Sequence, residues 1–281
     1  MKDLLLPRDL PVLARLLDGG GHPPLLAFDY DGVLAPIVPD PLGASMSRRT
    51  RSLLTALAAR FPVAIVSGRS FARLHRVAGG AAPFLVGNHG AEYLHRTPIP
   101  EAILVRVRRW EALVLAALEG MPGIQLEHKH STFAVHYSLA RDRGAARAVL
   151  RAVRALRGAR IVLGKNLVNV LPNAFPSKGD AVRKLLRNLG CRHALFVGDD
   201  VTDEDVFALP RDLVLGIHVG RGPSRAGFRL QKREDVDALL EALLSVARER
   251  EAAARRARRV AERRLGRRVG AAAPRAVGGS P

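Results

Sequence analysis

Residues 25–36 read LLAFDYDGVLAP, and this stretch decides the fold. The short apolar run at 25–28 is bounded by Pro24 and Gly32, which is typical of a parallel strand buried on both faces. Asp29 and Asp31 come directly after it. In open parallel sheets the functional site lies at the carboxyl ends of the strands. We therefore expect both carboxylates at the edge of the sheet where chemistry takes place.

The same arrangement recurs along the chain. Further strands are predicted at 62–66, 84–86, 194–197 and 213–219, and helices are predicted to start at Ser47, Ser70, Ser177, Thr202 and near Asp235. Strand followed by helix predicts an α/β fold, a Rossmann-like core with a mostly parallel sheet and helices on both faces.

The middle of the chain has another pattern. It predicts a helix at 101–120, strands at 124–130 and 132–139, a helix at 142–157, and a strand pair at 160–163 and 166–171. This is an α+β cap module inserted into the parallel domain. The predicted domains are a discontinuous core of 1–98 and 173–246, a cap of 99–172, and a basic Arg/Ala-rich tail of 247–281, partly disordered.

Composition limits the class of protein. The formal net charge is +19, and residues 248–281 hold eleven arginines and three glutamates. We expect a solvated tail, with binding to nucleic acid or another polyanion as the alternative, because the predicted strands lack clustered exposed aromatic residues for base stacking. The apolar runs are too short to span a bilayer, and residues 1–6 do not resemble a secretory signal. Cys191 is the single cysteine, so an intrachain disulfide is excluded and a cytoplasmic location is expected.

Polar groups from distant stretches meet at the expected sheet edge. The carboxylates of Asp29, Asp31, Asp199 and Asp203 would repel one another without a cation, and hard oxygen ligands beside a phosphate favour Mg²⁺. Asp29 would attack phosphorus, and Asp31 would act as general acid and base. Ser67 and Lys178 would hold the phosphoryl oxygens. Each feature alone is also compatible with an ordinary turn or helix start; their joint order favours a site.

The motifs FDYDGVLAP (28–36), AIVSGR (64–69), GNHGAE (87–92), Lys178-Gly179 and GDDVTDED (198–205) resemble the trehalose-6-phosphate phosphatase family of the haloacid dehalogenase superfamily. The resemblance covers roughly residues 24–240. It implies the catalytic roles given above, Mg²⁺ binding by Asp29, Asp199 and the backbone carbonyl of Asp31 with Asp203 close by, and a cap that closes over the sugar. Within the matched motifs, Gly68, Arg69, Asn88 and His89 are expected to contact the substrate.

Alternation in the cap strands suggests a polar sheet face that would suit a hydroxyl-rich ligand. Gln125, Glu127 and Lys129 share one face. We expect sugar contacts from Lys129, His136, Lys165 and Asn169, each of which is alternatively an exposed strand residue. The family commonly has Glu where Asn169 stands, and Arg near Leu171 and where Ser138 stands, and all three departures lie in the cap.

The leading functional prediction is hydrolysis of trehalose 6-phosphate, with association with a trehalose-phosphate synthase as a further expectation. A phosphatase acting on sucrose phosphate or mannosyl-phosphoglycerate is the alternative enzyme. A non-catalytic regulatory subunit of a sugar synthase is a third reading, which the presence of every catalytic position disfavours.

Overall fold

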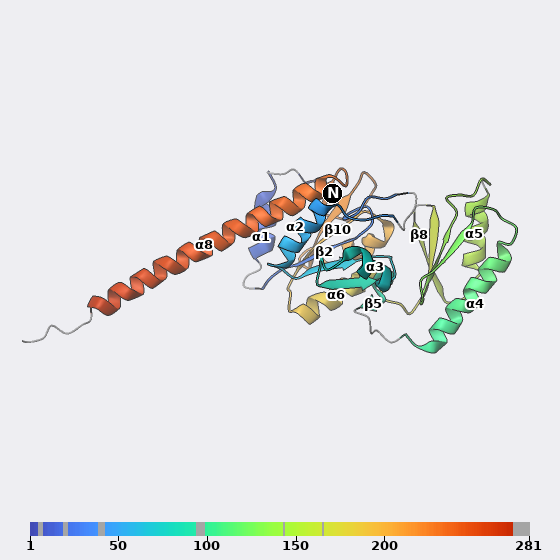
Figure 1. Ribbon diagram of the computed structural model, residues 1–281, viewed down its shortest axis with the longest axis horizontal. Helices are drawn as coiled ribbons and strands as arrows, with labels where there is room; N and C mark the ends of the chain where they lie inside the picture. Colours follow the sequence, from blue (N-terminus) through green and yellow to red (C-terminus); the bar gives the residue numbers. More distant parts are fainter. Residues whose placement is uncertain are drawn as a thin grey trace, which may run out of the picture.

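A computed structural model describes residues 1–4, 8–18, 22–38, 43–93, 99–142, 144–164 and 166–271. Within these residues the chain forms a large sheet and, beside it, a smaller one (Figure 1). The spatial order of the large sheet is β1 (Lys2–Asp3), β12 (Phe228–Leu230), β11 (Val214–Val219), β10 (Ala194–Gly198), β2 (Leu25–Phe28), β3 (Val63–Val66), β4 (Phe84–Gly87) and β5 (Glu92–Tyr93). All its pairs are parallel apart from β4 with β5.

Helices cover both faces of this sheet, because alternate strand side chains are buried on opposite sides. Phe28 and Ile65 pack with α1 (Leu10–Asp18), α2 (Arg48–Ala58), α3 (Phe71–Ala78) and α8 (Asp235–Ala271). Ala27 and Val66 pack on the other side with α6 (Lys178–Leu189) and the short α7 (Glu204–Phe207). Two 3₁₀ turns, η2 (Asn88–Gly90) and η3 (Val201–Asp203), follow β4 and β10. The predicted Rossmann-like core is confirmed.

Serine caps account for the start of two of the helices. The Ser47 side chain accepts a hydrogen bond from Thr50 N at the start of α2, and Ser177 caps α6 in a reciprocal capping box with Asp180. Ser70 occupies the corresponding position before α3 but makes no such bond. The carboxylate of Glu92 instead accepts the first N–H of α3, from Phe71, at 2.6 Å.

The smaller sheet is antiparallel, in the order β6 (Gln125–His128), β7 (Phe133–His136), β9 (Leu167–Pro172) and β8 (Ala159–Gly164). One face packs against α4 (Glu101–Ala117) and α5 (Ala145–Arg154), with Trp110 and Val149 buried between them. The first hairpin is shorter than its alternation predicts, because residues 129–132 form the turn and His130 has φ 64°. We call the four-stranded sheet β6–β9 the cap sheet; α4 and α5 cover one of its faces.

The last helix extends the predicted one far into the basic tail. Its first part, from Val236 to Ala247, buries apolar side chains against α1 and α2. Arg250 and Glu251 still pair with Asp18 and Arg60, and beyond them α8 projects away from the rest of the protein (Figure 1). The predicted disorder at the end of the chain falls mostly outside the described residues. Among those residues, no helix combines the length and the apolarity that crossing a bilayer requires.

Candidate active site

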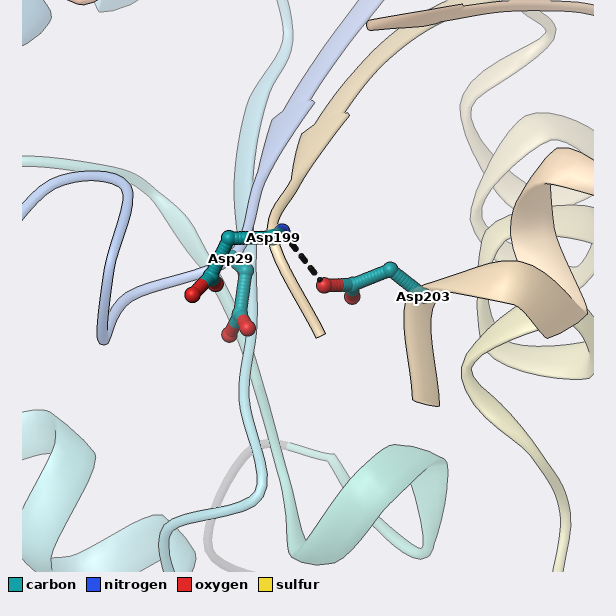
Figure 2. Close-up of side chains that lie close together, drawn as sticks. All are labelled: Asp29, Asp199 and Asp203. Atoms are coloured by element: carbon teal, nitrogen blue, oxygen red, sulfur yellow. Dashed lines mark hydrogen bonds between the residues drawn. The ribbon is translucent and has the colours of Figure 1, made fainter. Parts of the chain in front are cut away.

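Asp29 and Asp199 lie side by side because they follow neighbouring parallel strands. β2 pairs with β10 so that Phe28 stands opposite Val197, and Asp29 N donates to Val197 O at 2.8 Å. Asp203 comes from η3, just beyond Asp199. Carboxylate oxygens of the three residues lie within 4.8 Å of one another. Figure 2 shows the carboxylates of Asp29 and Asp199 next to each other, with Asp203 linked to the backbone N of Asp199.

Lys178 neutralises part of this negative charge. Its side chain is buried, and its Nζ lies 2.9 Å from Asp29 Oδ2 and 2.8 Å from Asp203 Oδ1. Burial alone would lower the pKa of Lys178, but the two carboxylates more than offset this and raise it, so the ammonium stays charged. Lys178, expected to hold phosphoryl oxygens at this edge of the sheet, lies beside Asp29 in the structure.

The Asp203 side chain connects Lys178 to the loop after β10 by hydrogen bonds. Its Oδ1 accepts from Lys178, and its Oδ2 accepts from the backbone N–H of Asp199 at 2.9 Å and of Asp200 at 3.0 Å. Both oxygens are therefore engaged by the protein. The fully buried Asp203 side chain thus fixes the backbone at Asp199 and Asp200.

The ionised forms of Asp29 and Asp199 are disfavoured at this site. Burial, with the charges of Asp203 and Asp31 adding to it, raises the pKa of Asp29 to about 8 despite Lys178. Burial and the neighbouring Asp29 and Asp203 raise the pKa of Asp199 to about 9. Such shifts mark a cluster that favours either protons or a cation.

A divalent cation fits these residues. Asp199 Oδ1 is buried and has no hydrogen-bond partner among the described residues, so one strong acceptor is left for a ligand. The three carboxylates exceed the single Lys178 ammonium by two negative charges, which matches a doubly charged ion. Gly32 keeps this space open, because a Cβ there would lie 2.0 Å from Asp199 Oδ2, and its φ of +77° is one that glycine adopts readily.

Asp31 lies apart from this group. Its carboxylate forms a two-point ion pair with Arg69, whose Nε and Nη2 donate at 2.7 and 2.6 Å. The Arg69 guanidinium is buried and also lies over the Tyr30 ring, 5.0 Å from its centroid. Arg69, expected among the substrate contacts, is therefore engaged with Asp31 in this structure.

The β3 end brings Ser67 and Gly68 to the same edge. Ser67 is buried, and its Oγ accepts from Arg69 N at 3.2 Å. A Cβ on Gly68 would come within 2.5 Å of the His89 ring, so the imidazole lies directly on the Gly68 backbone. The ring nitrogens of His89 are buried and have no hydrogen bond of normal geometry to the described residues. Burial, followed by the charges of Lys129 and Lys178, holds the pKa of His89 well below its usual range, which keeps the ring neutral.

The cap sheet contributes Lys129 and Asn169 to this region. Lys129 Nζ donates to Asn169 Oδ1 at 3.0 Å and to Gly68 O, in the core, at 3.3 Å. Burial lowers the pKa of Lys129, and the Glu127 carboxylate offsets part of that effect. Two predicted sugar contacts thus lie together at the junction of the sheets, next to His89.

Glu127 is a residue that the predicted site omits. Its carboxylate lies 2.9 Å from His136 Nε2, 3.7 Å from Lys129 Nζ and 3.3 Å from Arg73 Nη1 on α3. Burial would raise its pKa, but the hydrogen bond from His136 and the charge of Lys129 bring it down to about 2. Alternation already placed Glu127 on the face of Lys129; nothing in the sequence pattern pointed to Arg73.

The remaining predicted contacts are differently placed. The side chain of Asn88 is turned toward Glu92 and the β6–β7 turn, as detailed below. Lys165 lies outside the described residues. Of the positions where the cap departs from the family, Leu171 is buried and Ser138 is exposed just after β7.

The model of the trehalose-phosphatase family matches residues 27–232, which include most of the core strands, the cap sheet and every site residue above. The chain belongs to the trehalose-phosphatase family. The trehalose-phosphate phosphatase of Mycobacterium marinum is 33% identical over 255 residues, covering 86% of this chain and 62% of that protein. The chain thus spans less than two thirds of the length of this relative.

Solved structures of the trehalose-phosphatase family share the fold. The C-terminal domain of C. albicans trehalose-6-phosphate phosphatase superposes with a TM-score of 0.72 at 23% identity, covering 88% of this chain and 98% of that one. Aspergillus fumigatus trehalose-6-phosphate phosphatase gives 0.60 at 26% identity, covering 87% and 99%. A HAD subclass IIB sugar phosphatase, with a TM-score of 0.54 at 13% identity, has the same fold.

Proposed function

We propose that this protein is a magnesium-dependent phosphatase that hydrolyses trehalose 6-phosphate to trehalose and phosphate. The observation that carries the proposal is the buried Asp29 carboxylate, held by Lys178 and adjacent to Asp199, in a chain related to proteins named trehalose-phosphate phosphatases. In this proposal residues 1–98 and 173–246 form the catalytic core, and 99–172 form the cap that covers the sugar.

Asp29 acts as the nucleophile. Its Oδ1 accepts from Tyr30 N at 2.6 Å and its Oδ2 contacts Lys178, so the carboxylate is held in one orientation before substrate arrives. An Asp29 oxygen forms a bond to phosphorus while the bond from phosphorus to the sugar oxygen breaks, which gives an aspartyl phosphate. Water then attacks phosphorus, and the bond between phosphorus and Asp29 breaks.

Asp31 moves the protons of both half-reactions. It gives a proton to the leaving sugar oxygen in the first, and takes one from the attacking water in the second. In this structure both Asp31 oxygens accept hydrogen bonds from Arg69, so the proposed acid step requires at least one of these bonds to open, which frees an Asp31 oxygen to carry the proton.

Ser67 and Lys178 bind the phosphoryl oxygens in this mechanism. Mg²⁺ would be held by Asp29, Asp199 and the backbone carbonyl of Asp31, with Asp203 fixing the Asp199 loop. When bound, it supplies positive charge that offsets the charge developing on the phosphoryl group. Asp199 Oδ1 has no hydrogen-bond partner among the described residues, which supports its role as a Mg²⁺ ligand.

The cap contributes the sugar contacts. Lys129 and Asn169, with His136 and Lys165, are proposed to bind sugar hydroxyls, and Glu127 joins them because it is paired with both His136 and Lys129. A neutral Asn169 in place of the acidic residue common in the family can still accept from Lys129, so the cap keeps a hydrogen-bonding pair there.

The test is phosphate release with Mg²⁺ from trehalose 6-phosphate, sucrose 6-phosphate, mannosyl-phosphoglycerate and glucose 6-phosphate, with Asp29→Asn as the control. Trehalose 6-phosphate should have the highest kcat/KM, and Asp29→Asn should lose at least about 1,000-fold in kcat. Preference for another sugar phosphate would refute the substrate. Tight association with a trehalose-phosphate synthase without turnover would favour a regulatory subunit instead.

A further inference from the structure

Asn88 lies where the core meets the cap sheet. It is fully buried at the end of β4, and its φ of 47° is in the left-handed region, which asparagine adopts more readily than most residues. Its backbone N–H donates to Arg69 O at 2.7 Å. The core therefore fixes the main chain of Asn88 and directs its side chain toward the turn between β6 and β7.

Both the nitrogen and the oxygen of the Asn88 side-chain amide make hydrogen bonds, to that turn and to Glu92. Its Nδ2 donates to Lys129 O at 2.9 Å, to Glu92 Oε1 at 2.6 Å and, more weakly, to Ser131 Oγ at 3.2 Å. Its Oδ1 accepts from Thr132 Oγ1 at 2.9 Å. The opposite amide orientation would set an oxygen against a carboxylate and a carbonyl, so the network itself determines this one.

These contacts tie the cap to a helix of the core. Glu92, which accepts from Asn88, also accepts from Phe71 N at the start of α3 and from Ser131 Oγ. The turn itself is closed by Lys129 N donating to Thr132 O at 2.9 Å. Fixing the Lys129 carbonyl therefore fixes the start of a side chain whose ammonium lies 3.3 Å from Gly68 O in the core.

We propose that Asn88 is a positioning residue: its amide fastens the β6–β7 turn to the core, sets the place of Lys129 over the site, and does not contact substrate. The inference rests on the proposed function for the identity of the ligand that Lys129 meets. It differs from the expectation that Asn88 binds substrate, because the amide's hydrogen-bonding groups are already used by the protein.

Two substitutions at this position test the idea. Asn88→Gly removes the amide and keeps the left-handed backbone, and Asn88→Asp keeps the shape but sets an oxygen against Glu92 and the Lys129 carbonyl. The matched control is Asn166→Asp in the cap, which also has a positive φ, 59°, but is exposed. Steady-state kinetics with trehalose 6-phosphate and with p-nitrophenyl phosphate, which is too small to need the cap, are compared with hydrogen exchange of the turn amides.

For both Asn88 variants we expect KM for trehalose 6-phosphate to rise about tenfold, the factor that one lost hydrogen bond allows, and kcat/KM for p-nitrophenyl phosphate to stay within about twofold. Exchange at the Lys129 and Ser131 amides should accelerate, and Asn166→Asp should change neither quantity. In a Lys129→Met background, Asn88→Gly should have no further effect on KM, because the two residues act through one contact.

Additive losses in that double-mutant cycle, with unchanged exchange at 129–132, would show that Asn88 touches substrate and would overturn the proposal. Faster exchange throughout β2 and β10 would overturn it too, since Asn88 would then support the whole fold. If the wild-type protein does not hydrolyse trehalose 6-phosphate, the proposed function fails separately, and hydrogen exchange still decides the role of Asn88.

Discussion

When divalent cations are removed by a chelator, the free energy of unfolding of this protein should fall as the pH rises from about 6.5 to about 8. Burial and mutual repulsion raise the pKa of Asp29 from 3.8 to about 8 and that of Asp199 to about 9. In this range both groups hold a proton in the folded state and are ionised in the unfolded state. Unfolding then releases protons, so each increment of pH favours the unfolded chain.

The size of the effect follows from the number of protons released. One group contributes up to about 1.4 kcal/mol per pH unit, so the free energy of unfolding should fall by about 2 kcal/mol over this interval for one proton and about 4 for two. The corresponding loss in Tm is about 4–8 °C per proton for a chain of this size. His89 and His218 have lowered pKa values, so they reduce the stability of the protein only as the pH falls below about 6.5. They therefore do not contribute to the pH dependence between about 6.5 and about 8.

The assay is thermal and urea unfolding in EDTA and in excess Mg²⁺ at several pH values across the window. With Mg²⁺ the profile should be nearly flat, because a bound cation favours the ionised carboxylates, so the stabilisation by Mg²⁺ should grow with pH. The matched variant is Asp199→Asn, which removes one charge at similar shape. In EDTA near pH 8 it should be more stable than wild type, with a shallower profile, and should gain little from Mg²⁺.

A flat or rising profile for the chelated wild-type protein would refute the reasoning. So would an Asp199→Asn variant with the wild-type pH dependence. Either result would mean that the three carboxylates are already compensated by the protein and that a cation is not needed to hold them together.

Three further predictions follow from single contacts. Lys178→Met leaves the buried Asp203 carboxylate without its counter-ion, so chelated protein near neutral pH should lose about 3–5 kcal/mol of stability, measured by urea unfolding, and turnover should vanish. Gly32→Ala places a methyl group against Asp199 in a left-handed backbone, so calorimetric titration should show Mg²⁺ affinity at least about tenfold lower. Glu127→Gln weakens the pairing with His136 and should raise KM for trehalose 6-phosphate about tenfold while p-nitrophenyl phosphate hydrolysis is maintained.

The core and its carboxylate edge could be predicted from the sequence because they depend on short-range pattern. An apolar run followed by Asp29 specifies a buried strand and a strand-end carboxylate, and the strand–helix alternation specifies that such ends converge. The proximity of Asp29 and Asp199 follows from those two facts, whereas Lys178 reaches them from the start of α6. The short strands β1, β5 and β12 carry two or three residues each and have too little pattern to be recognised.

Contacts between the cap sheet and the core could not be predicted in this way. Alternation assigns Glu127 to a face of its strand but does not say that Arg73, on a distant helix, lies opposite. Nor does the pattern around Ser70 reveal that Glu92 takes over the capping of α3. Both contacts join residues that are far apart in the sequence, so they depend on how the elements pack and not on local periodicity.

The charge balance of the site explains why its cationic groups are divided between the two sheets. In the core, Lys178 offsets one of the three clustered carboxylates, and a divalent cation would offset the other two, which leaves the core edge nearly neutral. A phosphate ester that carries about two negative charges then needs positive charge from elsewhere. Lys129 can supply part of it from the cap, where it donates to the neutral Asn169 and shares the Glu127 carboxylate, 3.7 Å away, with Arg73 and His136. Substrate binding and apposition of the two sheets would therefore favour each other, since a poorly placed cap leaves the phosphate undercompensated.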